Sequence, residues 1–268
     1  MRADEWERYC GAGWQVESEE HVVKLRLDRP PGNRLNIAAL ERLNDIIHAL
    51  AQDEWARAVL LWSTGEDFCQ GVDLSDEELA ALMAEGRTER MRFAKLGQQV
   101  IEGWISLPIP TVAALRGNAI GGGACLITAS DFRVAHPSAR LSFPEIDRGL
   151  HLGWGILPRM VREFGLPWAR RLAMVGEKVQ IGSLPDRAFY QVGEGQEDEQ
   201  AERLALALAS KPPMAMRTIK SVFREITKED NLDTEDDALH FAQTIASQDF
   251  TEALAAFFEK RKGDYKGV

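Results

Sequence analysis

The chain has 268 residues, of which 45% are hydrophobic, and it contains seven Trp and eleven Phe. That is enough apolar material to fill one large core, or a core with a smaller appendage. The formal net charge is -10 and the pI is near 5.1, which argues against nucleic acid and acidic membrane surfaces as partners.

The three cysteines, Cys10, Cys69 and Cys125, are few and odd in number, and their spacing is not that of metal ligands. They favour a reducing compartment without a disulfide framework. No apolar run approaches the roughly 20 residues of a membrane span, and the first residues lack the apolar core of a signal peptide. We therefore expect a cytoplasmic protein with no membrane partner and no bound metal.

Helical and strand patterns alternate over the first hundred residues. Residues 1–18 are polar with scattered aromatics and predict an arm that packs on the body. Alternation over 21–27 predicts a strand, the helical spacing of apolar residues over 37–51 a helix, and the apolar run 58–62 a second strand. Residues 75–102 follow as a mostly helical stretch that could wall a pocket. This order predicts βαβ units with a parallel sheet under helical cover.

A glycine turn then joins a strand to a helix. Residues 111–115 follow two prolines and read as a strand, whereas residues 124–129 are small and apolar and read as a helix. Gly121, Gly122 and Gly123 lie between them, although each glycine costs about 1 kcal/mol relative to alanine in a helix. Two explanations are open. Either the turn packs tightly under the helix, or a backbone N–H at the positive helix end approaches a ligand oxygen.

The last third of the chain is predominantly helical. A polar, glycine-rich interruption at residues 193–200 precedes two long helical stretches, 202–228 and 233–262. Their size predicts a helical region that contacts another subunit. We divide the chain into a core over 1–200 and a C-terminal helical region over 201–268.

Three short motifs and the C-terminus together carry a family resemblance. They read Phe-Cys-Gln-Gly-Val-Asp-Leu (68–74), Gly-Asn-Ala-Ile-Gly-Gly-Gly (117–123) and Leu-Ser-Phe-Pro-Glu-Ile (141–146), and the chain closes with Ala-Phe-Phe-Glu-Lys-Arg-Lys (256–262). In this order and spacing they resemble the crotonase (enoyl-CoA hydratase/isomerase) superfamily over nearly the whole chain. The resemblance implies an α/β crotonase fold, in which repeated ββα units form a spiral core and a C-terminal helical region makes trimers.

The resemblance also implies how a substrate is held. Crotonases bind a coenzyme A thioester so that two backbone N–H groups grip its carbonyl oxygen and stabilise the enolate. By position these donors are Val72 and Gly122. Losing one such donor typically costs about 3–4 kcal/mol of transition-state stabilisation. The flanking Gly71, Asp73 and Gly121 are expected at the substrate, with Asp73 ordering its loop.

One carboxylate matches the family pattern and a second does not. Hydratases with two glutamates place one Glu in the Pro-Glu turn, here Glu145, and another two residues after the glycine triplet, where this chain has Cys125. Glu145 is the expected general base, with a pKa that an apolar pocket could raise. A thiol with a reference pKa near 8.5 is a poor substitute for a carboxylate, so Cys125 is interpreted as a packing residue beside the substrate.

A single glutamate favours isomerisation over hydration. Adding water shares proton handling between two carboxylates, whereas moving a proton from the α-carbon to the γ-carbon of an enoyl-CoA needs one. Open alternatives are a hydratase, dehydratase, decarboxylase or hydrolase, and a catalytically inactive CoA-ester binder. The acyl group could be specialised, such as a cyclic or carrier-protein-bound group, in a pocket shaped by residues 79–93, Trp104 and Trp154.

Four further residues complete the predicted site. His151 could assist an acid/base step near neutral pH, or simply be packed. Arg34 occupies the turn that faces coenzyme A in the family, and Phe241 with Lys260 matches a pair that relatives supply from a neighbouring subunit. The resemblance thus implies an acyl-CoA substrate, no tightly bound cofactor, and a homotrimer or a dimer of trimers.

Overall fold

The computed structural model describes residues 3–185, 188–228 and 234–265. The strands are β1 (Trp14–Glu19), β2 (Val22–Leu27), β3 (Ala58–Ser63), β4 (Thr111–Leu115), β5 (Asn118–Ile120), β6 (Phe132–Ala135), β7 (Arg140–Ser142), β8 (Val179–Gln180) and β9 (Tyr190–Gln191). The α-helices are α1 (Ile37–Gln52), α2 (Glu77–Glu85), α3 (Arg87–Ser106), α4 (Gly122–Ala129), α5 (Leu157–Phe164), α6 (Leu166–Met174), α7 (Glu197–Ala209), α8 (Pro213–Lys228), α9 (Thr234–Ile245) and α10 (Gln248–Glu259). Short 3-10 turns are η1 (Ala3–Tyr9), η2 (Ile146–Arg148) and η3 (Ile181–Ser183).

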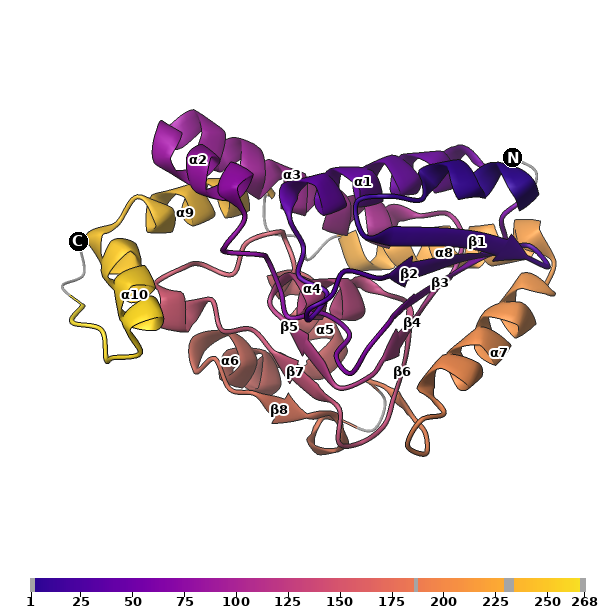
Figure 1. Cartoon of the computed structure of the whole chain (residues 1–268). Helices are drawn as coiled ribbons and strands as arrows, with labels where there is room; N and C mark the ends of the chain where they lie inside the picture. Colours follow the sequence, from indigo (N-terminus) through magenta and orange to yellow (C-terminus); the bar gives the residue numbers. More distant parts are fainter. Residues whose placement is uncertain (1–2, 186–187, 229–233, 266–268) are drawn as a thin grey trace.

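The larger sheet has the strand order β1-β2-β3-β4-β6-β9 (Figure 1). β1 and β2 are antiparallel, and the other neighbours pair in parallel, as the alternating pattern of the sequence predicts. A smaller sheet, β5-β7-β8, lies beside it, with β5 and β7 parallel and β8 antiparallel to β7.

Both faces of the larger sheet are buried, because successive side chains of a strand point to opposite faces. On β3, Val59 and Leu61 join the large core under α1, α3 and α4, whereas Ala58 and Leu60 point to the other face. That second face is covered by α7, whose buried apolar residues there are Ala201, Ala205 and Ala209. A boundary at residue 200 would therefore fall inside a helix that packs on the sheet.

The smaller sheet brings two of the sequence motifs together. β5 and β7 run in parallel with Asn118 opposite Arg140, and Gly121 N–H donates to Ser142 O at 2.9 Å. The residues that follow these two strands are the glycine turn and Glu145. Because parallel strands end at the same edge, the turn and the carboxylate are neighbours.

The N-terminal arm is more ordered than its composition predicts. It contains η1 and the edge strand β1, which the sequence reading missed. Trp6 and Trp14 are fully buried, and Trp14 Nε1 donates to Ala39 O at 2.8 Å. The polar residues between them face solvent, which masks the strand pattern.

Each long helical stretch is divided into two. The helical stretch predicted over 202–228 consists of two helices, because α7 ends at Ala209, ahead of Pro212, and α8 begins at Pro213. The stretch 233–262 is likewise interrupted at Ser247, whose hydroxyl accepts from Phe250 N–H at 3.0 Å and caps α10.

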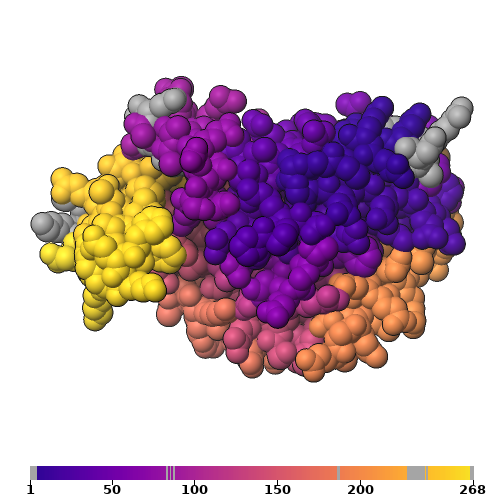
Figure 2. Space-filling model, viewed as in Figure 1, coloured from indigo at the N-terminus to yellow at the C-terminus, as the bar shows by residue number. Residues whose placement is uncertain are grey.

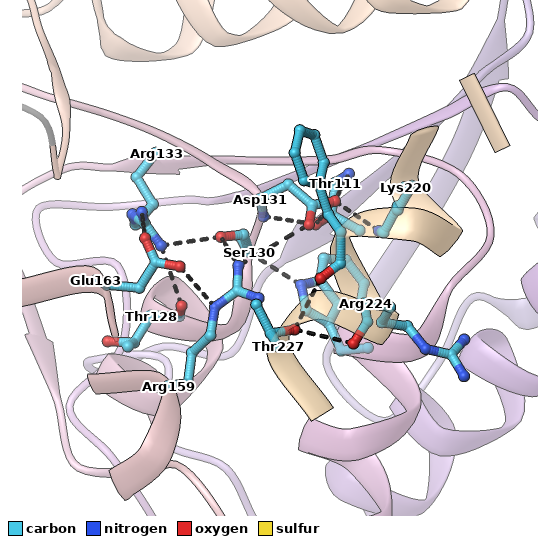
Figure 3. Close-up of polar contacts among 12 residues, drawn as sticks. Thr111, Thr128, Ser130, Asp131, Arg133, Arg159, Glu163, Lys220, Arg224 and Thr227 are labelled. Carbon is cyan, nitrogen blue, oxygen red and sulfur yellow. Dashed lines mark hydrogen bonds and ion pairs between the residues drawn. The ribbon is translucent and has the colours of Figure 1, made fainter. Parts of the chain in front are cut away.

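Helix α8 is attached to the core through its basic side chains (Figure 3). Lys220 Nζ lies 2.5 Å from Asp131 Oδ2 and donates to Ile109 O at 2.7 Å. Asp131 also accepts from Thr111 N–H at 2.9 Å, and Arg224 donates to Ser106 O at 3.2 Å. The polar face of this helix therefore packs inward.

The opposite face of α8 is apolar and exposed to solvent. Its large side chains recur at helical spacing and are 52–81% exposed: Met214, Ile219, Val222, Phe223 and Ile226. An unpartnered stripe of this kind is unusual for a monomer and marks an interaction surface.

The C-terminal helices α9 and α10 lie at the same end of the molecule as α2, away from the N-terminus (Figure 1; Figure 2). α9 packs along α3, and α10 packs on η2. Within the described ranges, no helix combines the length and the apolar character needed to cross a membrane.

Candidate active site

A cavity of about 370 Å³ opens where the glycine turns, the Glu145 turn and the C-terminal helices meet. Its lining is Gln70, Gly71, Val72, Leu74, Leu79, Ala80, Phe93, Ile120, Gly121, Gly122, Cys125, Pro144, Glu145, Arg148, Leu150, Leu152, Gly153, Trp154, Phe241, Ile245, Phe250, Leu254 and Phe258. Among these described lining residues, Glu145 is the sole carboxylate and Arg148 the sole cation. The cavity suits an apolar group that lies beside one carboxylate.

In the first glycine turn, Val72 forms a parallel bridge with Leu35, and its own backbone N–H points to the other side. Leu35 N–H donates to Gly71 O at 2.8 Å, and Asp73 N–H donates to Leu35 O at 2.8 Å. These bonds flank Val72 in a parallel bridge, and successive peptide groups of an extended chain point to opposite sides. The Val72 N–H is therefore directed to the side away from Leu35.

The second donor lies at a helix end. Gly122 is the first residue of α4, and its N–H is one of the four at a helix N-terminus without an intrahelical acceptor. The preceding Gly121 is the N-cap residue and has φ 52°. Because glycine has no side chain, it cannot cap the helix, and the helix end stays open. The positive end of the α4 dipole adds to any attraction for an oxyanion.

The two glycine turns touch backbone to backbone. A Cβ on Gly71, which has φ +91°, would lie 3.1 Å from Ile120 O, and a Cβ on Gly121 would lie 2.9 Å from Glu145 Oε1. A Cβ on Gly122 would lie 2.7 Å from the ring of Trp154. Close approach of loop, carboxylate and indole thus requires glycine at these positions.

Glu145 is a half-buried residue whose carboxylate has one oxygen without a hydrogen-bond partner among the described residues. It follows β7 and precedes η2, and its Oε2 is inaccessible to solvent and unpaired among the described residues. Burial raises the pKa of Glu145 to about 7, against smaller lowering effects of its own backbone N–H and of Arg148. A carboxyl that titrates near neutrality can both take and return a proton.

Cys125 lies in the first turns of α4 and is 2% exposed. It lines the same cavity, which fits the expectation of a packing residue beside the substrate. The slot that would hold a second glutamate therefore contributes a thiol to an otherwise apolar wall.

Asp73 and Arg34 lie on the outer side of the first turn. The Asp73 carboxylate accepts from Ser75 Oγ at 2.6 Å and from Arg29 Nη1 at 3.2 Å. Burial acts to raise its pKa, but these hydrogen bonds lower it overall. Arg34 is exposed and donates to Gln70 Oε1 at 3.2 Å, which places it beside a residue of the cavity lining.

His151 and Lys260 are not brought into the described lining of the cavity. His151 lies on a neighbouring depression, where its backbone N–H donates to Thr244 Oγ1 at 3.1 Å. Lys260 ends α10 with φ 54° and is exposed, two residues after Phe258 of the lining. Neither side chain is at Glu145 within this chain.

Phe241 reaches the cavity of its own chain. Its ring lies 6.3 Å from that of Phe93, which is also 6.3 Å from Trp154. A Cβ on Gly153 would lie 2.8 Å from Phe241. α9, which carries Phe241, packs on α3 of the same chain. Trp104, expected in the pocket, is instead a core residue bonded to Ser130 Oγ at 3.0 Å.

Sequence reasoning missed the residues that brace the glycine turns. Asp67 Oδ1 accepts from Asn118 N–H at 2.9 Å, and its Oδ2 accepts from Gln70 Nε2 at 2.9 Å. Burial acts to raise the Asp67 pKa, but these bonds lower it overall. Asn33 Nδ2 donates to Asp67 O at 3.1 Å. The signal was the cluster of Asx residues in turns, which hydrogen-bond local backbone.

Comparison with known proteins agrees with this geometry. Residues 17–268 match the family model described as enoyl-CoA hydratase/isomerase. The chain belongs to the enoyl-CoA hydratase/isomerase family. The family is enzymatic, so the chain is assigned to an enzyme family that acts on coenzyme A thioesters.

Individual relatives span nearly the whole chain. A Bacillus subtilis protein named "Probable enoyl-CoA hydratase" is 30% identical over 255 residues, covering 93% of this chain and 96% of the relative. The mitochondrial methylglutaconyl-CoA hydratase of Mus musculus is 32% identical over 265 residues, covering 94% and 81%. The crystal structure of an enoyl-CoA hydratase/isomerase from Pseudoalteromonas atlantica T6c superposes with a TM-score of 0.81 at 26% identity, covering 95% and 100%. The fold is thus the crotonase fold of this family.

Proposed function

We propose that this member of the family moves a double bond in an enoyl-CoA, with Glu145 as its general acid/base. The observation that carries the proposal is the single carboxylate in the lining of an apolar cavity, with one oxygen out of contact with solvent, beside two glycine turns. A 3-enoyl-CoA would enter with its thioester oxygen between the Val72 and Gly122 N–H groups.

The proposed step moves one proton. Glu145 takes a proton from the α-carbon, and the electron pair of that C–H bond moves into a dienolate whose negative oxygen is held by the two N–H groups. The protonated Glu145 then returns the proton to the γ-carbon, and the double bond lies between the α- and β-carbons. The carboxylate is regenerated and no water is consumed.

The environment of Glu145 supports this assignment. A desolvated carboxylate is a stronger base than one in water, and its raised pKa also makes the protonated form a usable acid near neutral pH. Cys125, in the slot of the second glutamate, would not position water.

Hydration is the second candidate, favoured by the names of the relatives. Both curated relatives described above are named hydratases. In that reaction Glu145 would handle the protons of water alone. Decarboxylation, or CoA-ester binding without turnover, is what remains if neither reaction is found.

The test uses 2-enoyl- and 3-enoyl-CoA esters of several chain lengths with the wild-type protein and with Glu145→Gln. Mass spectrometry and absorbance follow double-bond position, added water and free coenzyme A. Isomerisation without hydration, reduced at least about 100-fold in Glu145→Gln, is the expected result. Rapid hydration would favour the second candidate, and full activity of Glu145→Gln would contradict the role of Glu145.

We further propose that the coenzyme A moiety lies along the outer side of the first glycine turn. Arg34 is exposed there and is a suitable cation for phosphate. The exposed Lys260 at the end of α10 is the second proposed contact, from the same or a neighbouring chain.

The exposed apolar face of α8 supports the proposal that copies of this chain associate. We propose a homotrimer or a dimer of trimers, in which this face is covered by a second copy. Burying such a stripe would remove several large apolar side chains from water.

A further inference from the structure

Arg148 lies in the wall of the cavity, three residues after Glu145. Its Nη1 donates to Pro144 O at 3.3 Å, which fixes the peptide group just before the carboxylate residue. Its backbone N–H donates to Glu145 O at 3.0 Å, as does that of Leu150. Arg148 therefore contacts the turn on both sides of the Glu145 Cα.

The guanidinium of Arg148 also reaches the C-terminal helix. Its central carbon lies 4.9 Å from the centroid of the Phe257 ring, within the range of a cation–π contact. The same turn is packed tightly on α10, because a Cβ on Gly149 would lie 3.2 Å from the backbone of Asp249 and Phe250. One side chain thus links the Glu145 turn to the helix that supplies Phe250, Leu254 and Phe258 to the cavity.

We infer that Arg148 is a positioning residue that holds the Glu145 turn in place and joins it to α10. This inference rests on the proposed function, in which Glu145 transfers the proton. A carboxylate displaced by about 1 Å from its reacting geometry can lose about two orders of magnitude in rate, so the connection has a kinetic consequence.

The charge of Arg148 acts together with its position. Arg148 favours the ionised form of Glu145, Asp147 of the same turn opposes it, and burial opposes it most. The cavity residues from the glycine turns, from α2 and α3, and from α9 and α10 carry no charged side chain in the described lining. Removing the guanidinium therefore leaves only the backbone N–H of Glu145 to oppose the effects of Asp147 and burial.

The test compares Arg148→Met, Arg148→Lys and Phe257→Leu with wild type. Proteins labelled with ¹³C at the glutamate carboxyl, and assigned with Glu145→Gln, report the Glu145 titration by NMR without substrate. Steady-state kinetics on the best enoyl-CoA ester report kcat and KM. Arg171→Met is the matched control, because Arg171 also lies over a ring, 4.4 Å from that of Trp168, but is exposed and outside the described lining of the cavity.

In Arg148→Met we expect kcat to fall by about tenfold or more with little change in KM, and the Glu145 titration midpoint to rise. Arg148→Lys should keep the midpoint near that of wild type, and Phe257→Leu should lower kcat with the midpoint unchanged. Arg171→Met should match wild type in both readouts.

Two results would overturn the inference. One is wild-type kcat and titration in Arg148→Met. The other is a loss of kcat and of thermal stability with an unmoved midpoint, which would indicate a purely structural role. If Glu145→Gln keeps its activity, the proposed function fails instead, while the NMR titration still reports whether Arg148 acts on Glu145.

Discussion

At the scale of single residues, the approach of the two glycine turns can be tested with a matched pair. Gly71 and Gly65 both have positive φ, +91° and +79°, but a Cβ on Gly71 would lie 3.1 Å from Ile120 O, whereas one on Gly65 meets nothing within 4 Å. We expect Gly71→Ala to lower kcat by about 100-fold by displacing the Val72 donor, as loss of an oxyanion-hole contact does. Gly65→Ala, measured in the same assay, should keep its kcat; equal losses in both variants would contradict the proposed donor.

Glu145 should also make the free energy of unfolding depend on pH. Its pKa in the folded chain is about 7, above the ordinary 4.5, so between these pH values the folded chain holds a proton that the unfolded chain releases. The free energy of unfolding should therefore fall as the pH rises from about 4.5 to about 7, by at most about 3 kcal/mol. Glu145→Gln should lack this component.

Urea unfolding at pH 5 and pH 8 measures this linkage. We expect the difference between the two pH values to be smaller in Glu145→Gln than in wild type, and kcat/KM of wild type to fall below about pH 7 as the base becomes protonated. The same pH dependence in both proteins would show that the carboxyl is not desolvated.

The sequence identified the site residues that belong to motifs, but not the residue whose role depends on tertiary contacts. The motifs pointed to Glu145, Val72 and Gly122, and the structure brings all three residues to one cavity. Nothing in the sequence distinguishes Arg148 from an exposed turn residue, because its contacts with Pro144 O and Phe257 depend on how α10 packs.

At the scale of elements, the attachment of α8 through a buried lysine is the contact to test. Lys220 pairs with Asp131 at 2.5 Å, with side chains 11% and 21% exposed. We expect Lys220→Met to lower the free energy of unfolding by about 2–4 kcal/mol, because it leaves Asp131 partly buried without its nearest cation. Thermal and urea unfolding measure the change.

The control is an ion pair of the same type on the surface. Arg203 and Glu199 pair at 2.8 Å, with both side chains 67% exposed. Arg203→Met should change the free energy of unfolding by no more than about 0.5 kcal/mol. If Lys220→Met and Arg203→Met lower the free energy of unfolding equally, the Lys220–Asp131 ion pair does not stabilise the fold more than a surface pair does.

The elements most readily predicted were long segments with apolar residues at helical spacing, such as α1, and buried apolar runs, such as β4. In the smaller sheet, β5 was missed because it spans three residues, too few for a period to be visible. The α7–α8 break was signalled by Pro212 and Pro213, but the apolar periodicity on both sides outweighed it.

At the scale of the whole molecule, the exposed apolar face of α8 predicts association. Ile226 is 66% exposed on that face. We expect wild type to show the mass of a trimer or a larger multiple by light scattering, and Ile226→Glu to show a lower mass with the fold retained. Met174→Glu, at a 70% exposed position on α6, is the control and should keep the wild-type mass. A monomeric wild type would contradict the proposal.

Assembly also sets the limit of what the sequence could predict. The resemblance matched Phe241 to a residue that relatives supply from a neighbouring subunit, and within a single chain it lines that chain's own cavity. Which cavity a terminal helix closes depends on the packing of α9 along α3, and the local sequence of α9 is the same in either arrangement.

Whether Glu145 alone transfers the proton can be tested by following a label through one turnover. A 3-enoyl-CoA carrying deuterium on its α-carbon is converted in ordinary water, and NMR locates the deuterium in the product. If Glu145 alone carries the proton, part of the deuterium should appear on the γ-carbon, and Glu145→Gln should form little product. A product with no deuterium on its γ-carbon after the first turnover, or a product that has gained water, would contradict a single-carboxylate proton transfer.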